Sequence, residues 1–330
     1  HQGSPAYGRQ DAIDEGGTFR IAPGRLKADE QYITGAGGLA TAARKKHEGK
    51  MERNERMTRE KIRNTISREN PERDKLLQMC AEDDGGVKVL RPPEFEPNGK
   101  HPESMPRPSR ASQEAAGALH KIFDKTYIQP DLCFAVTKEF ALNLEPKPHI
   151  SPCSHGLNDG KKLGRGCVNN TAGGKPPCQP LNSDWLRDAA KEEHGKINNP
   201  QIKHIVELIT KMRRKLQKEG RGDEEIRLWK LDIKGAYTQL TFRADDIRFM
   251  GAELPEEVIL FFMGGTFGWS AMPFAFNVVT RAIVWEIDNG LIRGFAVMYV
   301  DDVWGVSAAK DAAHDMDAVK NMVEGLLCKG

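Results

Sequence analysis

The sequence lacks several features that would place it in a common protein class. Its six cysteines include no C-x-x-C pair, which argues against a zinc ribbon or zinc finger. No basic stretch followed by an apolar stretch opens the chain, so we see no secretory signal. These absences favour a reducing intracellular compartment, either the cytoplasm or the nucleus.

Apolar residues are also scarce. They make up 38% of the chain, and the mean hydropathy of −0.58 is low for one compact globule of 330 residues. We therefore expect part of the chain to be unfolded and the rest to form a folded domain. The net charge of +2 does not by itself indicate a nucleic-acid partner.

One uncharged run is long enough to cross a bilayer. Residues 258–280 carry no charge over 23 positions. The run is interrupted by glycines, by Pro273 and by Asn277, which favours a buried strand, a turn and the start of a helix. The sequence therefore predicts no membrane partner.

Residues 1–114 are predicted to be a disordered, charged N-terminal region that ends in a proline-rich linker. Residues 41–80 hold 12 Lys or Arg against 7 Asp or Glu, and the mixed signs favour a solvated segment over a basic nucleic-acid arm. Residues 91–110 hold six prolines, which indicate an extended linker. Order is predicted from about Ala115, with a short helix over 118–123, so the folded domain is expected over 115–330.

Three segments of this domain have clear patterns. Residues 145–185 have β-hairpin character. Residues 199–220 have apolar residues at helical spacing, and the opposite face is basic, which indicates either a solvated face or contact with template phosphates. Arg227–Ile233 alternates as a strand that directs Asp232 away from the core.

A pair of adjacent carboxylates lies near the C-terminus, in the run Tyr299-Val300-Asp301-Asp302. Apolar runs at 295–298 and 303–306 flank it, so the pair is predicted at the tip of a strand-turn-strand. Like charges this close repel unless a cation lies between them. Asp232 ends another predicted strand, 69 residues before Asp301. Three aspartates from two strands can hold a two-metal site for phosphoryl chemistry.

These residues resemble the motifs of a known family, the reverse transcriptases. Tyr299–Asp302 resembles their Y-x-D-D motif, and Leu231–Tyr237 resembles their first palm motif, an Asp on a strand with an aromatic five residues later. Phe267–Asn277 resembles the motif between the two, usually close to F-G-L-x-x-A-P-x-x-F-Q. The three motifs occur in the family's order within residues 120–330. The sequence around these motifs is similar to that of retrotransposon enzymes of the LTR or tyrosine-recombinase type.

The resemblance implies an α+β fold, the fingers and palm of a right-handed polymerase, with an antiparallel palm sheet backed by helices. It also implies an RNA-directed DNA polymerase, a nucleotidyltransferase that joins dNTPs to a primer 3′-hydroxyl with two Mg²⁺ or Mn²⁺ ions. Asp232 and Asp301 would bridge the ions, and Asp302 would support them. The backbone carbonyl of Ile233 would add a ligand.

Other positions match the family's substrate contacts. Tyr237 lies where the family has its sugar gate, although a core aromatic is the alternative. Gly268 allows a close approach to the dNTP or a template base. Tyr299 resembles a primer-contact residue, or else packs the hairpin. The remaining candidates are basic residues that either bind the triphosphate and template or form a surface loop: Lys161, Lys162 and Arg165.

The expected partners are an RNA or DNA template with its primer, dNTPs, and other polyprotein modules such as RNase H and an integrase or recombinase. The chain begins at His1 and ends within the predicted helix that follows the Asp pair, so we expect a polyprotein fragment without a thumb that is inactive alone. An RNA-dependent RNA polymerase is disfavoured by Val300 and Tyr237. A decayed or domesticated copy that binds nucleic acid without catalysis is the remaining alternative.

Overall fold

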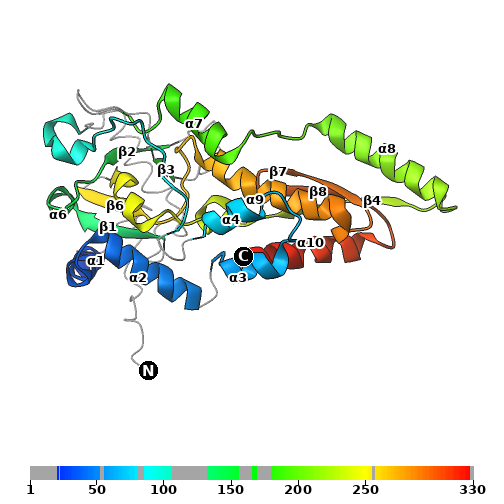
Figure 1. The fold of residues 1–330 in the computed structure, drawn as a ribbon, viewed down its shortest axis with the longest axis horizontal. Helices are drawn as coiled ribbons and strands as arrows, with labels where there is room; N and C mark the ends of the chain where they lie inside the picture. The colour runs from blue at the N-terminus through cyan, green and yellow to red at the C-terminus, as the bar shows by residue number, and fades with distance from the viewer. Residues whose placement is uncertain are drawn as a thin grey trace, which may run out of the picture. The chain divides into compact units, whose positions relative to one another are not determined.

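The computed structural model describes residues 21, 23–52, 56–80, 85–105, 132–155, 166–168, 180–254 and 257–327. The chain forms two compact units, each discontinuous in sequence. The first takes its residues from His1–Glu48, Lys88–Arg187 and Thr241–Ser270. The second takes them from Gly49–Val87, Asp188–Leu240 and Ala271–Gly330. Both units combine helices with a small sheet, which confirms the α+β class (Figure 1).

The first unit is built on a five-stranded sheet of order β1-β6-β5-β2-β3. Its strands are β1 (Cys133–Thr137), β2 (Ile150–His155), β3 (Gly166–Val168), β5 (Gly251–Leu254) and β6 (Val258–Phe262). β2 and β5 pair in parallel, and β2 and β3 pair antiparallel as the hairpin pattern predicted. All five side chains of β6 are buried. Its helical segments are α1 (Pro23–Ala36), η2 (Asn98–Lys100), η3 (Pro102–Ser104), α6 (Lys138–Leu142) and η5 (Ala244–Phe249), and α2 (Leu39–Glu52) begins in it.

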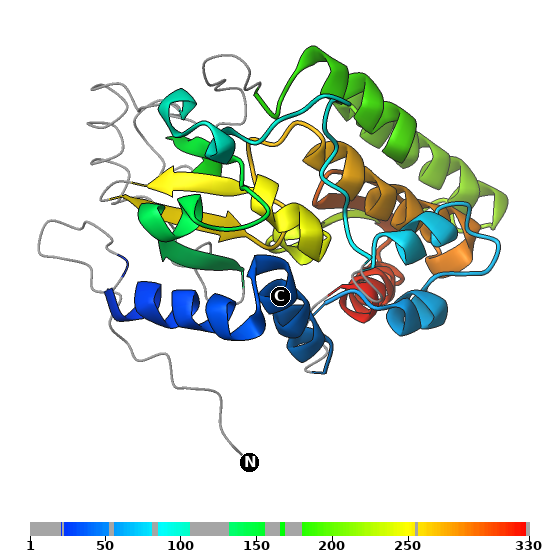
Figure 2. The same cartoon turned by 60° about the vertical axis from the view of Figure 1, so that its left-hand side comes forward.

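Helix α1 corrects the prediction that the N-terminal region is disordered. It packs beside the edge strand β1, as Figure 2 shows in blue and green. The Asp29 carboxylate accepts the Ala135 N–H at 2.9 Å, and Glu30 accepts the Thr137 N–H at 2.7 Å. These two carboxylates therefore satisfy backbone donors of a sheet edge, which would otherwise be left unpaired.

The described part of the proline-rich segment is also packed, which corrects the prediction of an extended linker. Asn98 is buried, and its side chain accepts the Ile150 N–H at 2.8 Å and donates to the Ile150 carbonyl at 2.6 Å. The Gly99 N–H donates to the carbonyl of Pro148 at 2.9 Å. Residues 106–114 and the helix predicted over 118–123 lie outside the described residues.

The second unit contains an antiparallel three-stranded sheet of order β4-β8-β7. Its strands are β4 (Ile226–Asp232), β7 (Phe295–Tyr299) and β8 (Asp302–Ala308). Its helical segments are α3 (Arg59–Thr65), α4 (Arg73–Gln78), α8 (Ile202–Lys218), η4 (Ala236–Gln239), α9 (Met272–Glu286), η6 (Ile287–Leu291) and α10 (Ala312–Leu326), and α7 (Asp184–His194) ends in it. The uncharged run 258–280 forms β6 and the start of α9, as predicted, and none of the helices in the described ranges is long and apolar enough to cross a membrane.

Helices α9 and α10 cover one face of this sheet. The Trp229 ring lies so close to Gly305 that a Cβ at position 305 would be 1.9 Å from Cε2 of the indole. The indole N–H donates to Ser307 Oγ at 3.0 Å, and that hydroxyl donates to Asp315 of α10 at 2.6 Å. This buried chain of hydrogen bonds fixes β4, β8 and α10 to one another, as polar networks with every member paired do.

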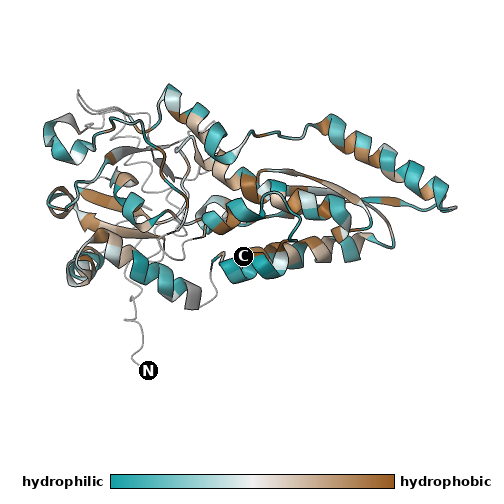
Figure 3. Cartoon of the chain, viewed as in Figure 1, coloured by the Kyte–Doolittle hydropathy of each residue, from teal (hydrophilic) through white to brown (hydrophobic). Residues whose placement is uncertain are grey.

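Helix α8 covers only part of the opposite face. Met212 and Leu216 in its second half pack on Val306 and Ala308 of β8. In its first half, by contrast, the apolar stripe is largely uncovered, and Ile202 is 81% exposed. Figure 3 shows apolar and hydrophilic bands alternating along α8. The helix itself was predicted correctly.

Helices α3 and α4, which also lie in the region predicted to be disordered, are fixed to α9 by polar contacts. Glu286 accepts the Ser67 N–H at 2.8 Å and the Asn70 amide at 2.9 Å. Arg281 donates two hydrogen bonds of 2.7 Å to the carboxylate of Glu72. A bidentate pair of this kind fixes both position and orientation.

Candidate functional site

The three aspartates singled out in the sequence meet at one end of the three-stranded sheet. β4 ends at Asp232, which lies directly opposite Asp302, the first residue of β8. The N–H of Ile233 donates to the carbonyl of Asp301 at 3.0 Å, which ties the end of β4 to the turn. Opposed residues in an antiparallel pair have Cβ atoms about 5 Å apart, so the carboxylates of β4 and β8 share one small region.

The turn between β7 and β8 has an unusual backbone. Val300 has φ of +55°, a conformation that β-branched residues rarely adopt. Its carbonyl accepts the hydroxyl of Thr280, on α9, at 3.1 Å. Strained residues of this kind are found mainly at functional sites, where the surrounding structure holds them in place. The strain here lies beside Asp301.

Lys230 provides a counter-charge that the sequence argument did not single out. Its Nζ lies 2.8 Å from Oδ1 of Asp302. The hydrogen bond to Asp302 and the charges of the three carboxylates raise the pKa of Lys230. The alternation of β4 in the sequence could have identified Lys230, because a residue two positions before Asp232 must lie on the same face of the strand.

Tyr237 and Tyr299 lie within electrostatic reach of the Asp pair. Tyr237 belongs to η4, which follows Gly235 in the left-handed region at φ +62°, and its ring packs edge-on against Phe276 with 5.8 Å between centroids. Burial, and then the charges of Asp301 and Tyr299, raise the pKa of Tyr237 to about 12. Tyr237 is thus a partly buried aromatic and also a neighbour of the carboxylates. Tyr299 is 48% exposed.

The types of donor atom at this end of the sheet suit a hard cation. Carboxylate and backbone oxygens are the ligands that Mg²⁺ prefers. In their present positions, however, no three Asp, Glu, His or Cys side chains in the described ranges are grouped as ligands of a metal ion. Asp302 is engaged by Lys230 instead. A metal ion at this end of the sheet would take its ligands from these aspartates and the Ile233 carbonyl.

Gly268 belongs to the first unit, in a loop that a residue missed by the sequence argument stabilises. The Asn182 side chain donates to the Gly268 carbonyl at 2.5 Å and accepts the Ser270 N–H at 2.9 Å. Gly268 has φ of +96°, which favours glycine, and the neighbouring Trp269 packs edge-on against Phe242. The side-chain amide of Asn182 thus bridges two backbone groups of this loop, the Gly268 carbonyl and the Ser270 N–H.

Three predicted contacts, Lys161, Lys162 and Arg165, lie outside the described residues. A comparison with models of protein families finds no match for the chain, and a comparison with curated proteins finds none either. What supports a function is therefore the chemistry of the chain's own residues.

Proposed function

We propose that the chain provides the palm and part of the fingers of an RNA-directed DNA polymerase from a retrotransposon polyprotein. The second unit would be the palm and the first the fingers. The observation that carries the proposal is the register of β4 and β8, which places Asp232 opposite Asp302 with Asp301 in the adjoining turn. A capping role for an isolated Asp at a strand end does not account for three carboxylates at one end of the sheet.

In this proposal a primer 3′-hydroxyl attacks the α-phosphate of a dNTP at the site formed by the aspartates. Bound Mg²⁺ or Mn²⁺ would supply the charge that lowers the pKa of the hydroxyl and neutralises the pyrophosphate leaving group. Asp232 and Asp301 would hold these cations, and Asp302 would support them. Lys230 keeps Asp302 oriented through its 2.8 Å contact.

Two tyrosines would select and position the substrates. The Tyr237 ring is held by Phe276, so it cannot easily turn aside from a sugar bound beside Asp301. A ribose 2′-hydroxyl at that position would meet the ring, and a deoxyribose would not. Tyr299 leaves the sheet two positions before Asp301 and is exposed, as a residue that contacts the primer must be.

Primer extension tests the proposal. The substrate is poly(rA)/oligo(dT) with dTTP and Mg²⁺, and the proteins are the parent, extended through its reading frame past Gly330, and its Asp301→Asn variant. We expect extension by the parent and none by the variant, with equal circular dichroism spectra. Extension by neither, from folded protein that still binds the primer–template, would favour the non-catalytic nucleic-acid-binding alternative.

A further inference from the structure

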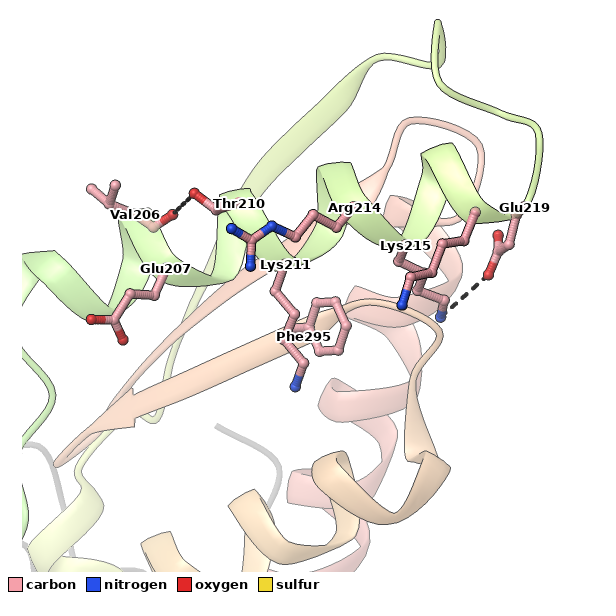
Figure 4. A pocket seen from close by; sticks show the side chains of 9 residues that line it. Val206, Glu207, Thr210, Lys211, Arg214, Lys215, Glu219 and Phe295 are labelled. Atoms are coloured by element: carbon pink, nitrogen blue, oxygen red, sulfur yellow. Dashed lines mark hydrogen bonds and ion pairs between the residues drawn. The ribbon is translucent and has the colours of Figure 1, made fainter.

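A groove lies between helix α8 and the beginning of β7, within the second unit. Its volume is about 660 Å³. Phe295 of β7 forms its floor, and four cationic side chains of α8 line its wall: Lys211, Arg214, Lys215 and Lys218. Figure 4 shows the side chains of Lys211 and Arg214 extending from α8 on the side that faces Phe295.

These cations form one stripe along the helix. Spacings of three, four and seven residues put them on a single face, and at about 1.5 Å per residue the stripe is about 10 Å long. Lys211 lies over the Phe295 ring at 4.2 Å, and Lys215 donates to the Arg293 carbonyl at 2.6 Å. Within the described residues, the guanidinium of Arg214 and the ammonium of Lys218 make no hydrogen bond or ion pair.

The groove therefore has an excess of positive charge that its own residues do not neutralise. Two carboxylates line it, those of Glu207 and Glu219. Glu219 lies 4.0 Å from Lys215, at the end of the helix, and Glu207 lies one turn before Lys211. A positively charged groove is what proteins use to follow a nucleic-acid backbone.

The groove and the aspartates share one face of one sheet. Every second residue of β7 lies on the face that also carries Asp302, namely Phe295, Val297 and Tyr299. Four residue steps along the strand lead from Phe295 to Tyr299, which corresponds to about 14 Å at about 3.4 Å per residue. Trp304, which pairs with Val297, is exposed on this same stretch, so the face between the two sites is open.

We propose that this groove binds the phosphates of a nucleic-acid strand whose 3′ end reaches the aspartates. The inference rests on the proposed function for the position of that end. Successive phosphates of one strand in a duplex lie about 3.4 Å apart along the axis, so a stripe of about 10 Å spans about three of them. The distance along β7 places the first of these contacted phosphates about four nucleotides behind the 3′ end. Such contacts fix the register of the strand without reading its sequence.

The first test measures binding alone. Fluorescence anisotropy with a labelled primer–template, in buffer without metal or dNTP, compares the parent with Arg214→Gln/Lys218→Gln. The matched control is Arg68→Gln/Lys320→Gln, which removes the same charges from exposed positions on α10 and on the segment after α3. We expect the Kd of the groove variant to rise on the order of tenfold and its salt slope to fall by about 0.9 for each phosphate that is no longer neutralised. The control should bind more nearly as the parent does.

The second test locates the bound phosphates. Single phosphates of the primer are replaced by neutral methylphosphonates, one position at a time. In the parent, replacements about four to seven nucleotides from the 3′ end should weaken binding, and in the groove variant the same replacements should have no further effect. Equal losses of affinity in parent and variant at every position would overturn the proposal. The proposal would also be overturned if the groove variant bound the primer–template as tightly as the control does. The same holds if the parent bound polyglutamate in the groove more tightly than it binds the oligonucleotide.

The two proposals can fail separately. If the parent does not extend a primer but the groove variant alone loses affinity for nucleic acid, the polymerase proposal fails and the groove proposal stands. If the parent extends a primer and the groove variant binds as the control does, only the groove proposal fails.

Discussion

Asp232 and Asp302 face each other across the β4–β8 pair, and the ammonium of Lys230 lies 2.8 Å from Asp302. Like charges that are directly opposed destabilise a sheet, so this end of the sheet depends on a counter-charge. Lys230 supplies one from within the chain, on the same face of β4. A bound cation would supply another, and the two would share the same carboxylates.

Replacement of Lys230 by Met keeps the apolar stem and removes the charge. We expect the melting temperature of Lys230→Met to be lower than that of the parent in EDTA, and the stabilisation by added Mg²⁺ to be larger. Differential scanning fluorimetry over a MgCl₂ series measures both, with Lys320→Met as the control for loss of a surface charge. A variant that melts with the parent in EDTA and responds equally to Mg²⁺ would contradict this role.

Tyr237 should decide between deoxyribonucleotides and ribonucleotides. Its ring is held edge-on to Phe276, so Tyr237→Ala opens the space that a 2′-hydroxyl needs, whereas Tyr237→Phe keeps the ring. We expect the preference for dTTP over UTP, as a ratio of kcat/KM, to fall about tenfold or more in the Ala variant and to be retained in the Phe variant. The same preference in all three proteins would show that Tyr237 is only a packing residue.

Gly305 should tolerate no side chain. Its missing Cβ leaves room for the Trp229 indole, so Gly305→Ala must displace that ring and disturb its hydrogen bond to Ser307. We expect a loss of about 1–3 kcal/mol in the free energy of unfolding, measured by urea titration. Gly222→Ala is the matched control, since a Cβ there meets its nearest neighbour at an ordinary 3.6 Å.

Acid should destabilise the first unit through His149. Burial lowers the pKa of His149 to about 4, and its Nδ1 accepts the Asn98 N–H at 3.4 Å. A folded-state pKa below the unfolded value gives stability that is present above about pH 6.5 and is lost as the pH falls toward 4. We expect His149 to account for about 2 kcal/mol of lost stability between pH 7 and pH 5. His149→Asn should be less stable at pH 7 and lose less on acidification; an equal loss in parent and variant would contradict this assignment.

Parts of the fold and site could be predicted because their signals are local. The alternation in Arg227–Ile233 predicts β4, since a period of two separates a buried from an exposed face. Pro273 in the first turn and Gly290 past the end predict α9, which spans Met272–Glu286. The prediction failed at α1, where Asp29 and Glu30 carry charges that a sheet edge uses. Nothing local distinguishes such a charge from a solvated one.

The sequence alone determined that three aspartates lie at strand ends, because the apolar runs around 299–302 and before Asp232 specify those strands. Only the tertiary structure decided that the strands pair in the register that puts Asp232 opposite Asp302, since a shift of one residue would turn the side chains to the other face. It also decided that Lys230 offsets their charge and that the cations of α8 lie on the same face of the sheet. Register and long-range charge pairing depend on how segments far apart in the chain pack, and local patterns do not encode that.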